Sequence, residues 1–251
     1  MLSLQCRLGA LVLCLAVVIP AGCGSATSTP TPGSQVATAA VAAGTPTATS
    51  TRPTGNAADH LDAGDAALSG GDLATAEQAY KNAITLDGKL AAAHLGLGNV
   101  YVRQNRLFEA EKAYLTALNI DPGMSGAHAN LGVVYYQMGQ YPKAIEQYKA
   151  VLQDNPEDAE TLYLLAAVYL QQQDLQAAEP LLLQARDLKP DLPEVYYGLG
   201  VLYKFKNQKT EAIAAFERFL ELGPGQDPQA AGHAQAEIDA LKQQPSAAPH
   251  S

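Results

Sequence analysis

The sequence predicts an all-α protein, an α-solenoid of five helical hairpins that ends in a C-terminal capping helix. Three observations support this prediction, and the first is a period of 34 residues that runs without an insertion. The second is a small residue at positions 8 and 20 of every period. The third is a set of helix-ending residues at positions 15 and 32. The five repeats are 57–90, 91–124, 125–158, 159–192 and 193–226.

The chain begins with an apolar segment, residues 1–22, that is typical of an export signal. Arg7 is its only charged side chain, and residues 8–19 after it are all apolar or Gly. Twelve residues of helix rise about 18 Å, which is too short to cross a bilayer core of about 30 Å. The segment is therefore predicted to be a signal peptide and not a membrane span.

The end of this segment, Ile-Pro-Ala-Gly-Cys at residues 19–23, resembles the lipobox of bacterial lipoproteins. The resemblance implies that Cys23 receives acyl chains and becomes the new N-terminus. We therefore expect an exported protein, lipid-anchored in the cell membrane or outer membrane and facing the periplasm or the exterior. Pro20 stands where the lipobox usually has Leu, and cleavage to a freely secreted protein is the alternative.

Residues 23–56 are expected to form a tether between the anchor and the folded part. Thr, Ala, Pro, Ser and Gly dominate this segment, and Arg52 is its only charged side chain. Such a composition buries too little apolar surface to offset the loss of conformational entropy on folding. We expect a disordered chain with a root-mean-square reach of about 30 Å.

Each 34-residue repeat is predicted to be a hairpin of a first helix, A, and a second helix, B. Small residues at positions 8 and 20 allow the two helices to approach closely, and large side chains at positions 11 and 24 fill the space between them. Position 8 holds Gly64, Gly98, Gly132, Ala166 and Gly200, and position 20 holds Ala76, Ala110, Ala144, Ala178 and Ala212. Position 11 holds Ala67, Tyr101, Tyr135, Tyr169 and Tyr203, and position 24 holds Tyr80, Tyr114, Tyr148, Leu182 and Phe216.

The helix boundaries follow from two further positions. Helix A is expected to end at position 15, where four of five residues tolerate the left-handed conformation found just past a helix end. These residues are Gly71, Asn105, Gly139, Gln173 and Asn207. Helix B is expected to end before position 32, which is Pro in four of five repeats. Pro180 lies within helix B of repeat four, where we expect a slight kink or loosening.

This pattern resembles the tetratricopeptide repeat (TPR) at nearly every signature position except the Trp at position 4, over about two thirds of the chain. The resemblance implies hairpins that stack into a right-handed superhelix, with the A helices on its inner, concave side. Residues 227–244 are predicted to form the capping helix, with Asp227 as its N-cap and Pro228 at its first position. Residues 245–251 are expected to be a disordered tail.

The sequence contains no enzyme signature. The chain carries 25 acidic and 16 basic residues, lacks cysteine after Cys23, and has no phosphate-binding loop or nucleophile elbow. We expect no catalytic residues, no cofactor, no metal and no nucleic-acid partner. His60, His94 and His128 all stand at position 4 and are interpreted as framework residues. The basic cluster of Lys204, Lys206 and Lys209 is interpreted as a solvated helix end.

Function is therefore expected on the concave face, which in TPR proteins binds a segment of a partner protein. Asn99 and Asn130 occupy positions at which chaperone-binding relatives hold a peptide main chain or its carboxylate. The accompanying basic clamp is absent, because its positions are Leu95, Glu160 and Leu164. The residues predicted to bind a partner are Asn99, Asn130, Val133, Tyr136, Tyr163, Leu164, Tyr197, Asp62 and Asp65.

The predicted partner segment is apolar or aromatic, and partly basic toward the Asp62 and Asp65 end. Tyr136, Tyr163 and Tyr197 are interpreted as groove residues, with packing between A helices as the alternative.

The predicted function is that of a membrane-anchored adaptor in envelope or surface complex assembly. The alternative is a structural spacer that self-associates through its ends or outer face. An accessory subunit of a secreted enzyme is not distinguished from the adaptor.

Overall fold

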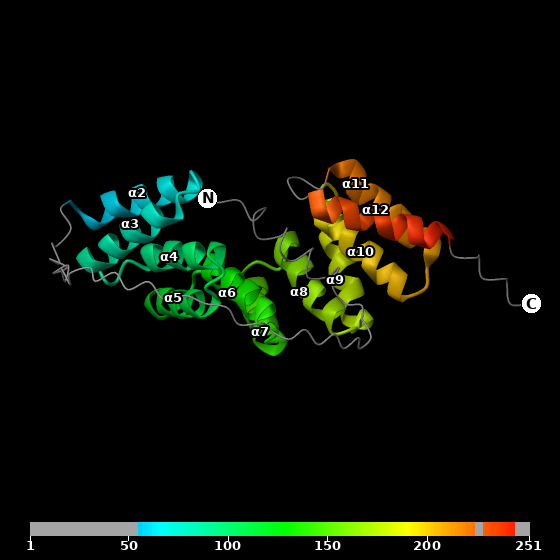
Figure 1. The fold of residues 1–251 in the computed structure, drawn as a ribbon. Helices are drawn as coiled ribbons and strands as arrows, with labels where there is room; N and C mark the ends of the chain where they lie inside the picture. Colours follow the sequence, from blue (N-terminus) through cyan, green and yellow to red (C-terminus); the bar gives the residue numbers. More distant parts are fainter. Residues whose placement is uncertain (1–54, 224–227, 244–251) are drawn as a thin grey trace, which may run out of the picture.

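The computed structural model describes residues 55–223 and 228–243 (Figure 1). These residues form helices and no strand, which confirms the predicted all-α fold. The signal peptide, Cys23, most of the tether, Asp227 and the C-terminal tail lie outside the described residues. The helices are α2 (Ala57–Ser69), α3 (Leu73–Leu86), α4 (Ala91–Arg103), α5 (Leu107–Ile120), α6 (Ser125–Gln137), α7 (Tyr141–Asp154), α8 (Ala159–Gln171), α9 (Leu175–Leu188), α10 (Pro193–Phe205), α11 (Lys209–Leu222) and α12 (Pro228–Gln243).

The ten helices from α2 to α11 form five antiparallel hairpins, one per 34-residue repeat. Helices α2, α4, α6, α8 and α10 are the A helices, and each packs against the B helix that follows it. Each B helix also contacts the next A helix, so the hairpins stack in chain order, as Figure 1 shows. Helix α12 packs on α11 and buries Ala230, Ala234, Ile238 and Leu241, as expected of a capping helix.

The ring at position 24 occupies the space that glycine at position 8 leaves open. A Cβ atom on Gly64 would lie 2.6 Å from Cε1 of Tyr80, and a Cβ on Gly96 of the next repeat would lie 2.4 Å from the same atom. Real Cβ atoms do not approach other atoms so closely. The tyrosine ring is therefore enclosed by two A helices, and it joins consecutive repeats as well as the two helices of one hairpin.

The turn between helices A and B has the same backbone conformation in all five repeats. Position 15 has a positive φ throughout, with values of 82° at Gly71, 58° at Asn105, 70° at Gly139, 58° at Gln173 and 56° at Asn207. The prediction for the end of helix A is thus confirmed. Gln173 adopts this conformation although its side chain disfavours it.

In repeats two, three and five, the side chain at position 4 connects the A helix to the preceding turn. The Nε2 atom of His94 lies 3.1 Å from the carbonyl oxygen of Gly88, and Nε2 of His128 lies 3.1 Å from that of Pro122. In repeat five, the hydroxyl of Tyr196 donates to the carbonyl of Pro190 at 3.0 Å. These contacts support the interpretation of the histidines as framework residues.

Pro180 does not interrupt its helix, because α9 continues through it from Leu175 to Leu188. Proline lacks an N–H, so the carbonyl one turn earlier loses its helical donor. The loosening expected there stays a prediction, which amide exchange over residues 175–182 would measure. Within the described part of the chain, none of the helices has the length and apolar character needed to cross a membrane.

Candidate functional site

The A helices form the inner side of the array. Consecutive A helices contact one another, and they approach more closely than consecutive B helices do. An array whose elements lie closer on one side curves toward that side, so the A helices provide the inner face. All nine residues predicted to bind a partner lie on A helices: Asp62 and Asp65 on α2, Asn99 on α4, Asn130, Val133 and Tyr136 on α6, Tyr163 and Leu164 on α8, and Tyr197 on α10.

Six of these nine side chains are buried, and this finding corrects the interpretation of the inner face as an open apolar and aromatic groove. The residues that are at most 4% exposed are Asn130, Val133, Tyr136, Tyr163, Leu164 and Tyr197. Helix α8 lies between the neighbouring hairpins with nearly all of its side chains buried. A partner cannot reach side chains of this kind unless the helices separate.

The three tyrosines interpreted as groove residues are buried in the core, which supports the alternative of packing between helices. The ring centroid of Tyr197 lies 5.6 Å from that of Phe216 and 5.3 Å from that of Phe219, both in edge-on geometry. Tyr136 stacks at a tilt on Tyr141, with 5.7 Å between centroids. Such aromatic contacts stabilise a core beyond the area they bury.

The accessible part of the predicted site lies at the N-terminal end, on α2 and α4. Asp62 and Asp65 are exposed and Asn99 is partly exposed. The hydroxyl of Tyr80 donates to Oδ1 of Asp65 at 2.6 Å, and the hydroxyl of Tyr114 donates to Oδ1 of Asn99 at 2.8 Å. In both repeats, position 24 of helix B fixes the polar side chain at position 9 of helix A.

Asn99 and Asn130 lie together, as the sequence suggested, but they bind each other. The Nδ2 atom of Asn130 donates to Oδ1 of Asn99 at 2.7 Å, and the buried Asn130 couples α6 to α4. The Asn99 oxygen thus accepts two hydrogen bonds, which set the orientation of its carboxamide. Asn99 faces the accessible surface, whereas Asn130 supports it from below.

The polar pairing between positions 9 and 24 ends at repeat three, where position 9 is Val133. Within the described residues the buried hydroxyl of Tyr148 therefore has no hydrogen-bond partner. Its burial raises the pKa of this phenol well above its usual value. In repeats four and five, position 24 carries Leu182 and Phe216, which have no hydroxyl. The interior thus changes from polar to apolar along the array.

Glu194 and Tyr163 place further polar groups within this apolar half. The hydroxyl of Tyr163 and Oε2 of Glu194 are buried without a hydrogen-bond partner in the described part of the chain. Burial raises the pKa of the Glu194 carboxyl, and the nearby Glu160 raises it further. Burial also holds the pKa of Tyr163 well above its usual value. In both groups, burial disfavours the charged form.

Arg103 was not among the residues predicted to bind a partner, and the structure places it at the accessible end. Its Nη1 atom donates to the carbonyl oxygen of Leu68 at 2.7 Å, across 35 residues of sequence. The guanidinium therefore satisfies a carbonyl at the C-terminal end of α2, where cations are favoured. Position 13 is Arg only in repeat two, so the 34-residue pattern gave no signal for this contact.

The remaining acidic, basic and histidine side chains lie outside the residues predicted to bind a partner. Across residues 55–223 and 228–243, no group of three His, Cys, Asp or Glu side chains has the geometry to hold a metal ion. Two lysines of the basic cluster are in ion pairs, Lys204 with Glu237 at 2.7 Å and Lys206 with Glu179 at 2.6 Å. These pairs support a structural interpretation of the cluster over contact with nucleic acid.

Comparison with known families agrees with the fold and the repeat positions. Tetratricopeptide repeat profiles match residues 64–105, 98–139, 130–193 and 169–238. Together they span the chain from the first hairpin into the capping helix. The chain belongs to the tetratricopeptide repeat proteins.

Several solved structures have a similar fold. The structure of YrrB, described as a TPR protein with an unusual peptide-binding site, is 23% identical, with 72% of this chain and 92% of that chain covered and a TM-score of 0.57. PilW, described as a widely conserved type IV pilus biogenesis factor, is 18% identical over 73% and 92% of the two chains, with a TM-score of 0.62. MamA from Desulfovibrio magneticus RS-1 is 22% identical over 68% and 97%, with a TM-score of 0.61. A search of curated proteins gave no match.

Proposed function

We propose that this TPR protein is an adaptor that binds an extended segment of a partner protein on the inner face of α2 and α4. The observation that carries the proposal is the fixed orientation of Asp65 and Asn99 by the hydroxyls of Tyr80 and Tyr114. Side chains held in place before binding lose less entropy when a partner arrives. Oriented carboxylate and carboxamide groups can bind the main chain of an extended peptide.

The spacing of the two side chains suits an extended chain. Asp65 and Asn99 occupy position 9 of consecutive repeats, and packed helices lie about 8–10 Å apart. An extended chain rises about 3.3 Å per residue, so the two side chains would contact partner residues about three positions apart. A partner segment that binds in this way requires no movement of α6, α8 and α10, whose residues on the inner face are buried.

The charge of this end favours a basic segment. Asp59, Asp62 and Asp65 are exposed on α2, and the whole chain has a formal net charge of −9. Arg103 lies at the same end but donates to the Leu68 carbonyl. A Lys or Arg side chain of the partner would therefore meet a surface of net negative charge, which speeds association and favours basic segments. The apolar residues of α6, α8 and α10 on the inner face are buried, so they offer little surface for a purely aromatic partner segment to bind.

We also propose that the adaptor works at a membrane, held by acyl chains on Cys23. Support for this part comes from the sequence of residues 1–23. Among the proteins of the same fold, PilW is a pilus biogenesis factor and YrrB has a peptide-binding site. An anchored protein of this fold suits the assembly of an envelope or surface complex. Labelling with a palmitate analogue tests the anchor, and Cys23→Ser should abolish both the label and membrane retention.

The adaptor is tested by crosslinking and co-purification from native membranes. Asp62→Asn/Asp65→Asn removes two charges and keeps an acceptor for Tyr80, so the variant should fold. We expect it to recover at least ten-fold less of a partner that the unaltered protein captures. The matched control is Asp154→Asn/Glu157→Gln, which removes the same charge from exposed residues at the end of α7 and in the turn that follows.

Equal recovery of the same partners by both variants would contradict the proposal. A peptide competition assay gives an independent result. Basic segments should displace the partner more effectively than acidic segments of the same length. Stronger displacement by acidic segments would exclude the α2 and α4 surface as the binding site.

A further inference from the structure

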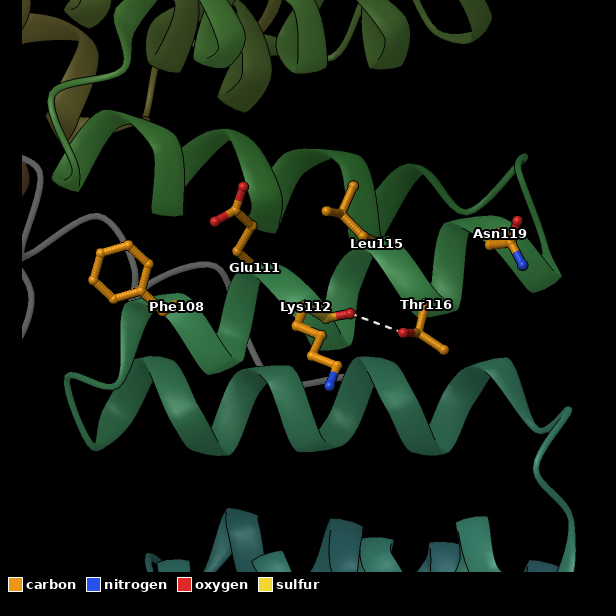
Figure 2. A pocket seen from close by; sticks show the side chains of 6 residues that line it. All are labelled: Phe108, Glu111, Lys112, Leu115, Thr116 and Asn119. Atoms are coloured by element: carbon orange, nitrogen blue, oxygen red, sulfur yellow. Dashed lines mark hydrogen bonds between the residues drawn. The ribbon is translucent and has the colours of Figure 1, made fainter.

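The outer surface of α5 exposes two large apolar side chains. Phe108 is 75% exposed and Leu115 is 46% exposed, and they are two helical turns apart. Glu111 and Lys112 lie between them on the same surface. Figure 2 shows these four side chains together with Thr116 and Asn119, which complete the lining of a shallow depression on this one helix. We call this surface the α5 patch.

The repeat framework does not require the α5 patch. Phe108 stands at position 18 and Leu115 at position 25, and no other repeat has large apolar residues at both positions. Position 18 is otherwise Ala74, Pro142, Gln176 and Thr210, and position 25 is otherwise Lys81, Lys149, Leu183 and Glu217. Exposed apolar residues that packing does not explain indicate an interaction surface.

The order of residues on the α5 patch is self-complementary. Phe108 and Leu115 lie at equal distances along the chain from the point between Glu111 and Lys112. An antiparallel second copy of α5, related by a two-fold axis through that point, places Phe108 against Leu115 of the second copy. The same axis places Glu111 against Lys112 of the second copy. One operation thus matches both the apolar and the charged positions, as a two-fold interface requires.

We propose that this protein forms a homodimer through antiparallel packing of the α5 patch against the α5 patch of a second copy. A parallel arrangement would bring Glu111 near Glu111 of the second copy, which is repulsive. Among the described residues neither Glu111 nor Lys112 forms an ion pair. Burial raises the pKa of Tyr135 to about 12, and the nearby Glu111 carboxylate contributes to this shift.

The size of the α5 patch predicts a weak dimer. One pair of helices buries less than the roughly 1,600 Å² of a standard interface, so the dimer should form and dissociate readily. Two copies confined to one membrane have a higher effective concentration, which favours the dimer. The inner face of α2 and α4 is built from other helices and stays accessible, so each dimer would present two partner-binding surfaces.

The dimer is tested with the full chain in native membranes, by incorporation of a photo-crosslinking amino acid at position 115. We expect a crosslinked species of twice the chain mass, with the crosslink at or next to Phe108 of the second copy. The matched control carries the same amino acid at Lys149, an exposed residue at position 25 of repeat three. The control should give at least ten-fold less dimer.

Charge-reversal variants distinguish an effect on the dimer interface from an effect on folding. Glu111→Lys alone places like charges at both ends of the contact, and Lys112→Glu alone does the same. Each single variant should lower the dimer yield at least five-fold, and the double variant Glu111→Lys/Lys112→Glu should restore it to within two-fold. Unchanged yields in the single variants, no rescue in the double variant, or crosslinks to another protein or to residues 1–54 would overturn the proposal.

Discussion

Gly132 and Tyr148 share a space that holds only one side chain. A Cβ atom on Gly132 would lie 2.5 Å from Cε1 of Tyr148. The Tyr148 ring of α7 can therefore occupy its position only because residue 132 of α6 has no side chain. The same pairing joins Gly98 to Tyr114 and Gly200 to Phe216, with 2.5 Å and 2.6 Å between the corresponding atoms. The glycine therefore acts by admitting a large side chain, and not through backbone flexibility.

The variant Gly132→Ala should lower the free energy of unfolding by about 1–3 kcal/mol, because the added methyl group forces the Tyr148 ring to move. Gly126→Ala is the control, since a Cβ atom there meets nothing within 4 Å. That control should be stabilising by about 0.4–1 kcal/mol through reduced entropy of the unfolded chain. Urea unfolding followed by circular dichroism measures both, and equal effects would refute the steric account.

Tyr148→Phe should leave stability unchanged or raise it by up to about 1 kcal/mol, because the hydroxyl it removes is buried without a partner in the described chain. Tyr114→Phe should be destabilising by about 0.5–1.5 kcal/mol, since it removes the donor to Asn99. The two variants delete the same atom at the same repeat position. If urea unfolding showed a larger loss of unfolding free energy for Tyr148→Phe than for Tyr114→Phe, the hydrogen bond between positions 9 and 24 would not contribute to stability.

Gln173→Gly should be stabilising by about 1 kcal/mol, because Gln173 has a φ of 58° and glycine adopts this conformation without strain. The neighbouring Gln172 provides the control, since it has a φ of −83°. Gln172→Gly should be neutral or destabilising. Thermal unfolding of the two variants distinguishes backbone strain from a general effect of glycine in this turn.

Glu77 should make stability depend on acid pH. Its hydrogen bond with Lys81, supported by Gln104 and Arg106, lowers its pKa from 4.5 to about 2. Because the folded pKa lies below the unfolded one, the stabilisation is complete above about pH 4.5 and is lost as the pH falls toward 2. Glu77→Gln should therefore cost about 1–3 kcal/mol at pH 7 and much less near pH 2.

Urea unfolding of the Glu77→Gln variant at a series of pH values measures this loss. Glu109→Gln is the control, because Glu109 pairs with the same Arg106 but its side chain is 49% exposed. The control should change stability by less than about 0.5 kcal/mol at any pH. A Glu77→Gln effect that stays constant from pH 7 to pH 2 would contradict the assigned cause.

The fold was predictable because it depends on a local and repeated pattern. Each hairpin requires a small residue, a large side chain and two helix ends at fixed spacing, and the 34-residue period repeats these requirements five times. Gln173 has a positive φ because it stands at position 15 of its repeat, although the side chain of glutamine disfavours this conformation. The period alone thus determined the helices, their pairing and the positions of the turns.

The accessibility of the site was not predictable in this way. Tyr163 and Tyr197 occupy positions that face inward in an isolated repeat, but consecutive A helices approach closely enough to enclose them. Asp65 and Asn99 stay accessible, and the tyrosines that orient them lie 15 residues later on helix B. The sequence by itself determined which residues could face inward. Only the tertiary structure decided which of them reach the surface, because burial depends on the distance between helices that are not adjacent in sequence.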